Sequence, residues 1–121
     1  MKVSRLIVSA MATFLAASSA TAAVLATEQF VIVIVKRCPE GDVACNDVSY
    51  TGINRKTGEA ISLKGQAWVR MCADAVTPCE HVGWQFKNGE FTYRVRETPP
   101  SLEVERGGKT LIDQKAVWLE Y

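Results

Sequence analysis

Four cysteines have the most regular spacing among the chemically reactive residues of this 121-residue sequence. They are Cys38, Cys45, Cys72 and Cys79, with six residues between the members of each pair. Both intervals contain proline and aspartate, which favour turns. An even number of cysteines in a small exported protein is typical of disulfides. The spacing favours Cys38–Cys45 and Cys72–Cys79, although the sequence leaves three connectivities open.

A structural zinc site is the alternative use of four cysteines. Zinc ligands paired along the chain are usually separated by about two to four residues, fewer than the six found here. A catalytic dithiol would need a Cys-x-x-Cys motif, which the sequence lacks. A glycine-rich phosphate loop is also missing, because Gly107-Gly108 is typical of a turn. We therefore expect no metal and no other cofactor.

His81 is the only histidine in the sequence. A Ser–His–Asp triad would need it as the general base, but its place beside Cys79 favours a loop residue next to a disulfide. The carboxylates are scattered, and Asp42 and Asp74 belong to predicted turns. A pair of glycosidase carboxylates is an alternative that no local feature favours. The sequence therefore predicts a protein that is not an enzyme.

The candidate binding residues are Arg94, Arg96, Trp118 and Tyr121. Arginine side chains suit carboxylates and phosphates, whereas the interleaved glutamates favour a solvated, charge-balanced face. Trp118 is out of phase with Val117 and Leu119, so one of these two sets is expected to be partly exposed. An exposed tryptophan near a chain end would be a candidate for a partner interface.

The N-terminal segment has the pattern of a secretory signal peptide. Lys2 and Arg5 precede an uncharged stretch, residues 6–26, that is apolar at first and then small and weakly polar. Cleavage after Ala22 leaves residues 23–121, and cleavage after Ala26 is a second option. An uncleaved membrane anchor is the alternative, because the stretch is long enough to span a bilayer. Its alanine, serine and threonine content makes such insertion weak.

The part that follows the signal peptide is expected to be one domain of balanced charge. Without Lys2 and Arg5 it has 12 basic and 13 acidic residues, a net charge of about −1. This balance argues against nucleic acid as a partner and against adsorption to anionic lipid. We expect a soluble periplasmic or secreted protein without stable membrane insertion. The sequence does not predict its oligomeric state.

Short β-rich runs separated by turn residues predict an all-β fold. The β-branched run from Phe30 to Val35 suits a buried strand. Further runs follow at 48–51, 60–63, 67–71, 82–95 and 116–121, and Gly65 is expected to break one of them. This pattern predicts a small antiparallel sandwich or barrel of about seven to eight short strands, with mostly up-and-down connections.

Turn residues in the C-terminal half predict specific strand registers. Asn88-Gly89 is typical of a type I′ hairpin, which would place Phe86 opposite Phe91 and Trp84 opposite Tyr93. Side chains on one face of such a hairpin would all be aromatic or aliphatic. A compact turn at 98–101 and another at Gly107-Gly108 would extend this face. The resulting core row would consist of Val82, Val95, Val104 and Leu111.

Three segments carry a family resemblance. They are Asn46–Asn54, Thr57–Gly65 and Gly83–Gly89, the last followed by Tyr93. Together they resemble the small exported enterobacterial proteins grouped as Fels prophage protein-like, over most of residues 45–118. The resemblance implies little about function, because that family is largely uncharacterised.

The order of a cysteine before a strand ending in tyrosine, a glycine-centred hairpin and an aromatic strand is also similar to the C-type lysozyme inhibitors. Those inhibitors are small, exported, β-rich and disulfide-bonded, and they enter the lysozyme cleft with a Ser-Gly-x-x-Tyr loop. This sequence has no Ser-Gly pair, so the similarity concerns the fold alone.

The sequence therefore favours a non-catalytic exported domain that binds a protein or a glycan of the cell envelope. A lysozyme inhibitor is the first alternative, and a glycan-acting enzyme is the alternative from a different class.

Overall fold

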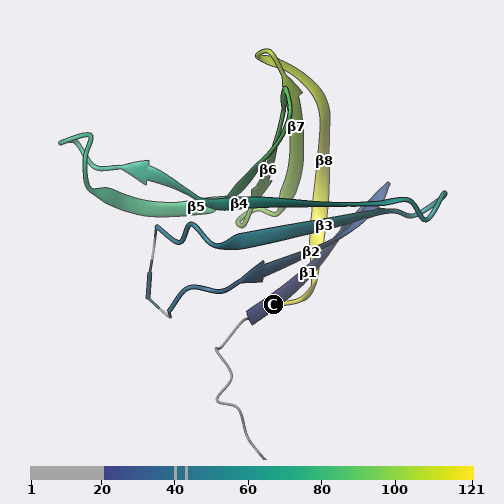
Figure 1. Ribbon diagram of the computed structural model, residues 1–121, viewed down its shortest axis with the longest axis horizontal. Coiled ribbons are helices and arrows are strands. Elements are labelled where there is room, and N and C mark those ends of the chain that lie inside the picture. The colour runs from purple at the N-terminus through teal and green to yellow at the C-terminus, as the bar shows by residue number, and fades with distance from the viewer. Residues whose placement is uncertain (1–20, 40, 43) are drawn as a thin grey trace, which may run out of the picture.

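The computed structural model describes residues 21–39, 41–42 and 44–121, and these residues form a closed barrel of eight antiparallel strands (Figure 1). The predicted all-β fold is confirmed, with the barrel as its form. The strands are β1 (Thr21–Thr27), β2 (Phe30–Lys36), β3 (Val48–Asn54), β4 (Ala60–Met71), β5 (Pro78–Asn88), β6 (Phe91–Arg96), β7 (Ser101–Arg106) and β8 (Lys109–Glu120).

Each strand pairs with the next along the chain, and β8 pairs with β1 to close the barrel. The up-and-down connections are therefore as predicted. Closure gives every strand two partners, so the barrel has no open sheet edge at which another strand could add. The described residues contain no helix long and apolar enough to cross a membrane.

β1 is a strand that the sequence analysis did not predict, and its first two residues, Thr21 and Ala22, were assigned to the signal peptide. Residues 1–20 of that predicted peptide lie outside the described residues, whereas Thr21 and Ala22 begin β1. Ala23 and Leu25 are buried in the core, and β1 closes the sheet between β2 and β8. The alanine-rich composition hid the strand, because alanine has low β-propensity and the same residues fit a cleavage region.

The barrel interior is filled by large side chains. The largest fully buried ones are Trp84, Tyr50, Phe86, Leu25, Ile32, Ile34 and Leu102. An eight-stranded barrel has an interior just wide enough for such a core. β2 has one face in the barrel interior and the other on the outer surface. Ile32 and Ile34 on the inner face are buried, whereas Val31 and Val33 on the outer face are only half-buried. The predicted burial of this run thus applies to one face.

Gly65 does not break a strand, as was predicted, but lies in the middle of β4. It pairs with Phe86, and a Cβ at this position would collide with the carbonyl oxygen of Gln85 and with the Phe86 ring. The missing side chain therefore gives the aromatic ring the space to lie over the strand. Glycine at this position allows β5 and the Phe86 ring to pack closely against β4. The low β-propensity of glycine, on which the prediction of a strand break relied, does not reveal this role.

The predicted β5–β6 hairpin exists, but its register and turn type were wrong. Asn88 pairs with Phe91, so Gly89 and Glu90 form the turn, and Phe86 faces Tyr93 instead of Phe91. Gly89 has φ 62°, whereas Asn88 stays in the strand. Positive φ at the first turn position alone is typical of a type II′ turn, which spares asparagine a left-handed conformation. The shift is by two residues, so the inner face keeps its aromatic side chains.

The next two registers differ from the prediction for separate reasons. A four-residue turn between β6 and β7 places Val95 opposite Leu102, not Val104. The Gly107-Gly108 turn pairs Arg106 with Lys109 as expected, but a β-bulge then brings Val104 opposite Ile112. Leu111 is consequently 50% exposed, because one inserted residue moves the following side chains to the other face. The predicted core row is therefore wrong, because Val95 pairs with Trp84 and Leu102, and Val104 pairs with Tyr93 and Ile112.

Both predicted disulfides are present. Their Cα atoms are 5.7 Å apart in Cys38–Cys45 and 4.9 Å apart in Cys72–Cys79. The first closes the β2–β3 connection and the second closes the β4–β5 connection. In an up-and-down barrel alternate connections lie at the same end. The two loops therefore share one end of the barrel with Thr21 and Tyr121, and in Figure 1 both loops lie on the left.

Candidate binding site at one end of the barrel

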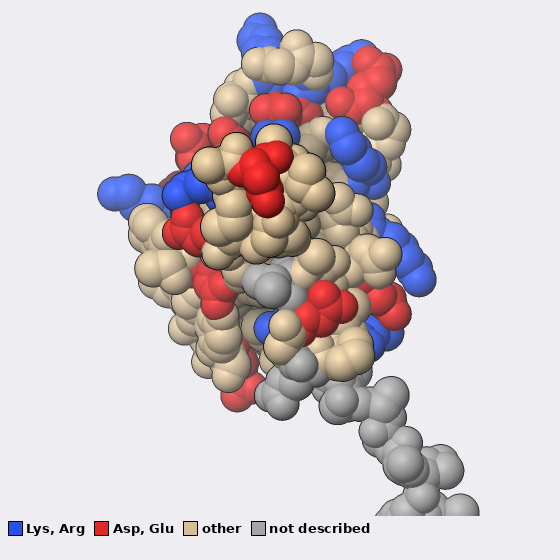
Figure 2. Space-filling view, turned by 90° about the vertical axis from the view of Figure 1, so that its left-hand side faces the viewer, with Lys and Arg blue, Asp and Glu red and all other residues tan. Residues whose placement is uncertain are grey.

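The end that carries the disulfide loops contains two neighbouring cavities, of about 510 Å³ and about 280 Å³. Residues that line both are Lys36, Gly41, Asp42 and Cys45. The larger cavity is completed by Thr21 and Ala22 of β1 and by Tyr121, and the smaller one reaches the inner face of the sheet. We call this end the barrel mouth. Figure 2 shows the molecule from this side, with acidic and basic side chains interspersed.

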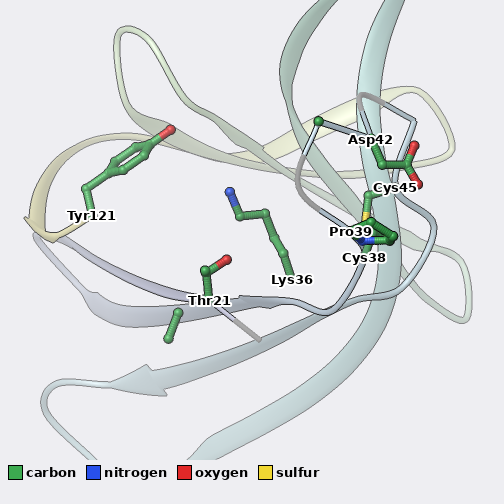
Figure 3. Close-up of a pocket in the computed structure, with 9 residues that line it drawn as sticks. Thr21, Lys36, Cys38, Pro39, Asp42, Cys45 and Tyr121 are labelled. Atoms are coloured by element: carbon green, nitrogen blue, oxygen red, sulfur yellow. A yellow bond between two sulfur atoms is a disulfide. The ribbon is translucent and has the colours of Figure 1, made fainter. Parts of the chain in front are cut away.

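Lys36, the last residue of β2, connects the two cavities. Its side chain extends into the space between Tyr121 on one side and the Cys38–Cys45 loop on the other (Figure 3). Its Nζ lies 5.5 Å from the ring centroid of Trp84, within the range of a cation–π contact. The mouth therefore presents an ammonium group next to an aromatic ring.

The Cys38–Cys45 loop forms one wall of the mouth. Cys45 is only 4% exposed, and its carbonyl oxygen accepts a hydrogen bond from the Ala67 amide at 2.6 Å. Asp42 lies in the same loop, where its Oδ1 accepts a hydrogen bond from the Ala44 amide at 3.2 Å. The predicted role of Asp42 in a turn is therefore confirmed. The loop is attached to β4 as well as to its own strands.

His81 lies in β5 and faces the smaller cavity, so the prediction of a loop residue was wrong. The structural reason is that β5 continues through the disulfide, with His81 paired to Val69. Its Nε2 lies 3.1 Å from Oε1 of Glu97. Desolvation lowers the pKa of His81 below its usual 6.5, and Lys36 lowers it too, against the opposing effect of Glu97. The imidazole is therefore mainly neutral at pH 7, and its Nε2 faces the carboxylate of Glu97.

Aromatic rings cross the mouth in a series of edge-to-face contacts. The ring centroids are 5.1 Å apart for His81 and Trp84, 6.1 Å for Trp84 and Trp118, and 4.6 Å for Trp118 and Tyr121. Trp118 also donates from Nε1 to the carbonyl oxygen of Glu97 at 3.1 Å. The indole N–H of Trp84 is buried and has no acceptor within the described part of the chain. These contacts form a continuous aromatic cluster at the mouth, of which His81, Trp84 and Tyr121 line the cavities.

The four predicted binding residues occupy two different places. Trp118 is half-buried and Tyr121 is exposed, and both belong to the mouth. The set exposed on the outer face is Val117 and Leu119, at 60% and 58%. Arg94 and Arg96 lie on the outer surface of β6, because the residue between them, Val95, is buried. The structure therefore does not bring all four candidates together.

Lys36 and Glu97 are residues of the mouth that the sequence analysis did not select. Lys36 follows an apolar strand and Glu97 follows a strand of alternating polarity, so both resemble ordinary solvated charges at strand ends. The only available signal was their position, since each ends a strand that leads to the same end of the barrel. That signal requires the barrel topology, which a pattern of strands alone does not provide.

At the opposite end of the barrel, hydrogen bonds connect side chains to the neighbouring loops. Arg55 donates from Nη1 to the carbonyl oxygen of Thr27 at 2.7 Å, and Gln114 donates to Gln29 at 2.9 Å. Across residues 21–39, 41–42 and 44–121, no three side chains of His, Cys, Asp or Glu lie together as metal ligands. The mouth is therefore the better candidate for a ligand site, and the groups on its lining suit hydrogen bonding and stacking.

No family model, curated protein or solved structure matches this chain. The resemblances to the Fels prophage protein-like group and to the lysozyme inhibitors therefore stay predictions.

Proposed function

We propose that this protein is an exported, non-catalytic binding module of the cell envelope, which takes a glycan fragment at the barrel mouth. The observation that carries the proposal is the pair of adjoining cavities at one end of an otherwise filled barrel. Ligand sites of β-barrels are typically found at such mouths. Edge-to-face aromatic rings beside hydroxyl, ammonium and carboxylate groups suit a sugar, which offers both an apolar ring face and hydroxyl groups.

The chemistry of the lining supports binding more than catalysis. The thiols of the mouth are oxidised to a disulfide, so they offer no nucleophile. Nε2 of His81 is engaged with Glu97. Because a carboxylate only accepts, Nε2 carries the proton of the neutral imidazole, and a general base would have to act through Nδ1. The contact with Glu97 holds the imidazole in place.

A glycan-acting enzyme is the second candidate, because Asp42 and Glu97 line the same 280 Å³ cavity. Glycoside hydrolysis uses two carboxylates on one sugar. Each of these carboxylates already has a local partner, since Asp42 accepts from the Ala44 amide and Glu97 contacts His81. Both are therefore used in positioning the mouth, and the enzyme ranks below the binding module.

Export is supported by the signal-like N-terminus and by the two disulfides, which persist in oxidising compartments. The two cleavage options have different consequences for the barrel. Cleavage after Ala26 would remove Ala23 and Leu25 from the core and most of β1 from the sheet. Cleavage after Ala22 removes only the start of β1 and widens the mouth at Thr21. We therefore favour Ala23 as the first residue, and intact mass of the exported protein tests this choice.

The experiment that tests the binding function is a ¹H–¹⁵N NMR titration of the exported protein with a chitotetraose probe. We expect saturable shifts at the indole N–H of Trp84 and Trp118 and at His81. Lys36→Gln should weaken binding about tenfold, because it removes a charge from the mouth. Lys64→Gln is the matched control, since Lys64 is exposed on β4 and should leave the affinity unchanged.

Three outcomes would contradict the proposal. Absence of any shift at millimolar probe would remove the glycan site. Shortening of the probe during the titration would favour the enzyme. Inhibition of a C-type lysozyme at micromolar protein, with no effect of free probe on the spectrum, would favour the inhibitor.

A further inference from the structure

The outer face of the sheet carries a tryptophan held beneath two arginines, on strands β4 and β6. The guanidinium carbon of Arg96 lies 4.9 Å from the Trp68 ring centroid, and that of Arg94 lies 5.7 Å from it. Both distances are within the range of cation–π contacts. Gly83 of β5 pairs with Trp68 on one side and with Arg96 on the other. Because Gly83 has no side chain, the indole of Trp68 and the side chain of Arg96 can meet across it.

Arg96 differs from the other arginines of the described chain in its polar contacts. Each of the other five donates to, or forms an ion pair with, another protein group. They are Arg37 with Ser49, Arg55 with Thr27, Arg70 with Glu80, Arg94 with Glu105, and Arg106 with Glu90. The guanidinium of Arg96 has no such partner within the described chain. Its neighbour Glu97 is directed to His81 in the barrel mouth, on the other side of the sheet.

An arginine loses side-chain entropy when it is held against a ring, and the five N–H donors of Arg96 have no acceptor within the described residues. Arg96 is nevertheless half-buried and stacked on Trp68. The guanidinium is therefore positioned in advance for an acceptor from outside the chain, and carboxylates and phosphates match its planar geometry.

The charges around Arg96 limit the kind of anion that fits. Arg94 lies 3.1 Å from Glu105 and 3.9 Å from Glu103, so the adjacent strand β7 presents two carboxylates that repel a long polyanion. A short uronic acid oligosaccharide can place one carboxylate at Arg96 and extend over β5 and β4, away from these glutamates. We infer that Arg96, held by Trp68, binds a carboxylate of an acidic glycan, at a second site on the outer face of β4–β6.

This site is independent of the barrel mouth, because Arg96 and the mouth residues lie on opposite sides of the sheet. The test uses the folded exported protein and two probes, tetragalacturonate and its methyl ester, which has the same rings without the charges. We expect NMR shifts at the Arg96 Nε–H and the Trp68 indole N–H with the acid alone. Arg96→Gln should weaken tetragalacturonate binding tenfold or more, in line with the loss of a charge-assisted hydrogen bond.

Arg70→Gln is the matched control, because it removes the same charge from β4, the strand that carries Trp68, where Arg70 pairs with Glu80. It should change the affinity less than threefold. Trp68→Leu should weaken binding while leaving the Arg96 charge in place, since it removes the platform. The Lys36→Gln variant of the mouth should bind tetragalacturonate as the parent does, which separates this inference from the proposed function.

Equal losses in Arg96→Gln and Arg70→Gln would overturn the inference, because binding would then follow net charge. Equal binding of the methyl ester would overturn it by excluding the carboxylate. Tighter binding of an Asp-Gly repeat peptide than of tetragalacturonate would replace the glycan with an acidic protein segment and would overturn the inference as stated.

Discussion

The two disulfide loops have the same spacing and lie at the same end of the barrel, yet their surroundings differ. In the Cys38–Cys45 loop, Cys45 is part of the core and its carbonyl oxygen is bonded to β4. In the Cys72–Cys79 loop, Cys79 is exposed, and the bonds that hold the loop join its own residues. In Figure 1 this second loop is the tip of the β4–β5 hairpin, which projects from the barrel.

The difference shows that a disulfide's spacing does not determine its structural role. Each disulfide closes a loop of eight residues, so the chain-entropy contribution is the same for both, about 2.5 kcal/mol. Any further difference in stability must come from packing. The first loop belongs to the folded core and to the wall of the mouth, whereas the second is a local clamp on a hairpin.

Removal of each disulfide is the strongest test of this comparison. We expect Cys38→Ala with Cys45→Ala to lower the free energy of unfolding by about 3–5 kcal/mol, because buried packing is lost in addition to the entropic effect. The Cys72→Ala and Cys79→Ala pair should cost about 2–3 kcal/mol. Urea denaturation of both double variants measures this difference. Equal losses would show that the buried position of Cys45 contributes nothing beyond loop closure.

We expect ligand binding to be lost in the variant without Cys38–Cys45 and kept in the variant without Cys72–Cys79. Chitotetraose shifts at Trp84 should disappear in the first double variant, provided that circular dichroism shows a folded barrel, and persist in the second. Persistence in both would show that the Cys38–Cys45 loop is not needed as a wall of the mouth.

The titration of His81 is the second test, because this residue lies beneath the first loop. Its pKa is lowered in the folded state, so the unfolded chain binds a proton at higher pH than the folded chain. The resulting stability is complete above about pH 6.5 and is lost as the pH falls through the lowered folded pKa. Urea denaturation between pH 8 and pH 5 should show this loss in the parent and a reduced loss in His81→Gln.

NMR gives an independent measurement of the same pKa. The chain has one histidine, so a single imidazole C–H resonance should titrate below pH 6.5. A midpoint above 6.5 would contradict the dominance of desolvation and would mean that Glu97 has the larger effect on the imidazole.

The sequence allowed prediction of features that depend on local pairing. The fold class, the approximate number of strands, both disulfides and the position of the Gly107-Gly108 turn were all correct. Each depends on short-range spacing, alternation or turn chemistry. Alternation along the last strand left open whether Trp118 or the set of Val117 and Leu119 would be exposed, and the structure exposes Val117 and Leu119.

Features that depend on long-range packing were not predictable in the same way. β1 looked like the end of a signal peptide because closure against β8 is what makes it a strand. Leu111 was misplaced because a bulge is not encoded in a period of two. Lys36, His81 and Glu97 meet only after β2, β5 and β6 are rolled into a barrel. The mouth therefore forms only when the sheet closes into a barrel, and no local sequence motif encodes it.

The third test addresses the second loop and should have the smallest effect. Asp74 accepts hydrogen bonds from the amides of Val76 and Thr77 at 2.9 Å, and from the Thr77 hydroxyl at 2.6 Å. The Thr77 hydroxyl and these amides lower the pKa of Asp74 to about 2. The ionised form is favoured in the folded loop, so this local order is complete above about pH 4 and is lost as the pH falls toward 2.

Asp74→Ala should therefore speed amide exchange at residues 76 and 77 and leave the rest of the barrel unchanged, with a Tm shift below about 4 °C. Asp47→Ala is a suitable control, because Asp47 is exposed and lies outside both disulfide rings. If Asp74→Ala instead slowed or quickened exchange at Trp84 and Ala67, the hairpin tip would be coupled to the mouth. The two loops would then act as one unit, and the distinction between a core loop and a local clamp would fail.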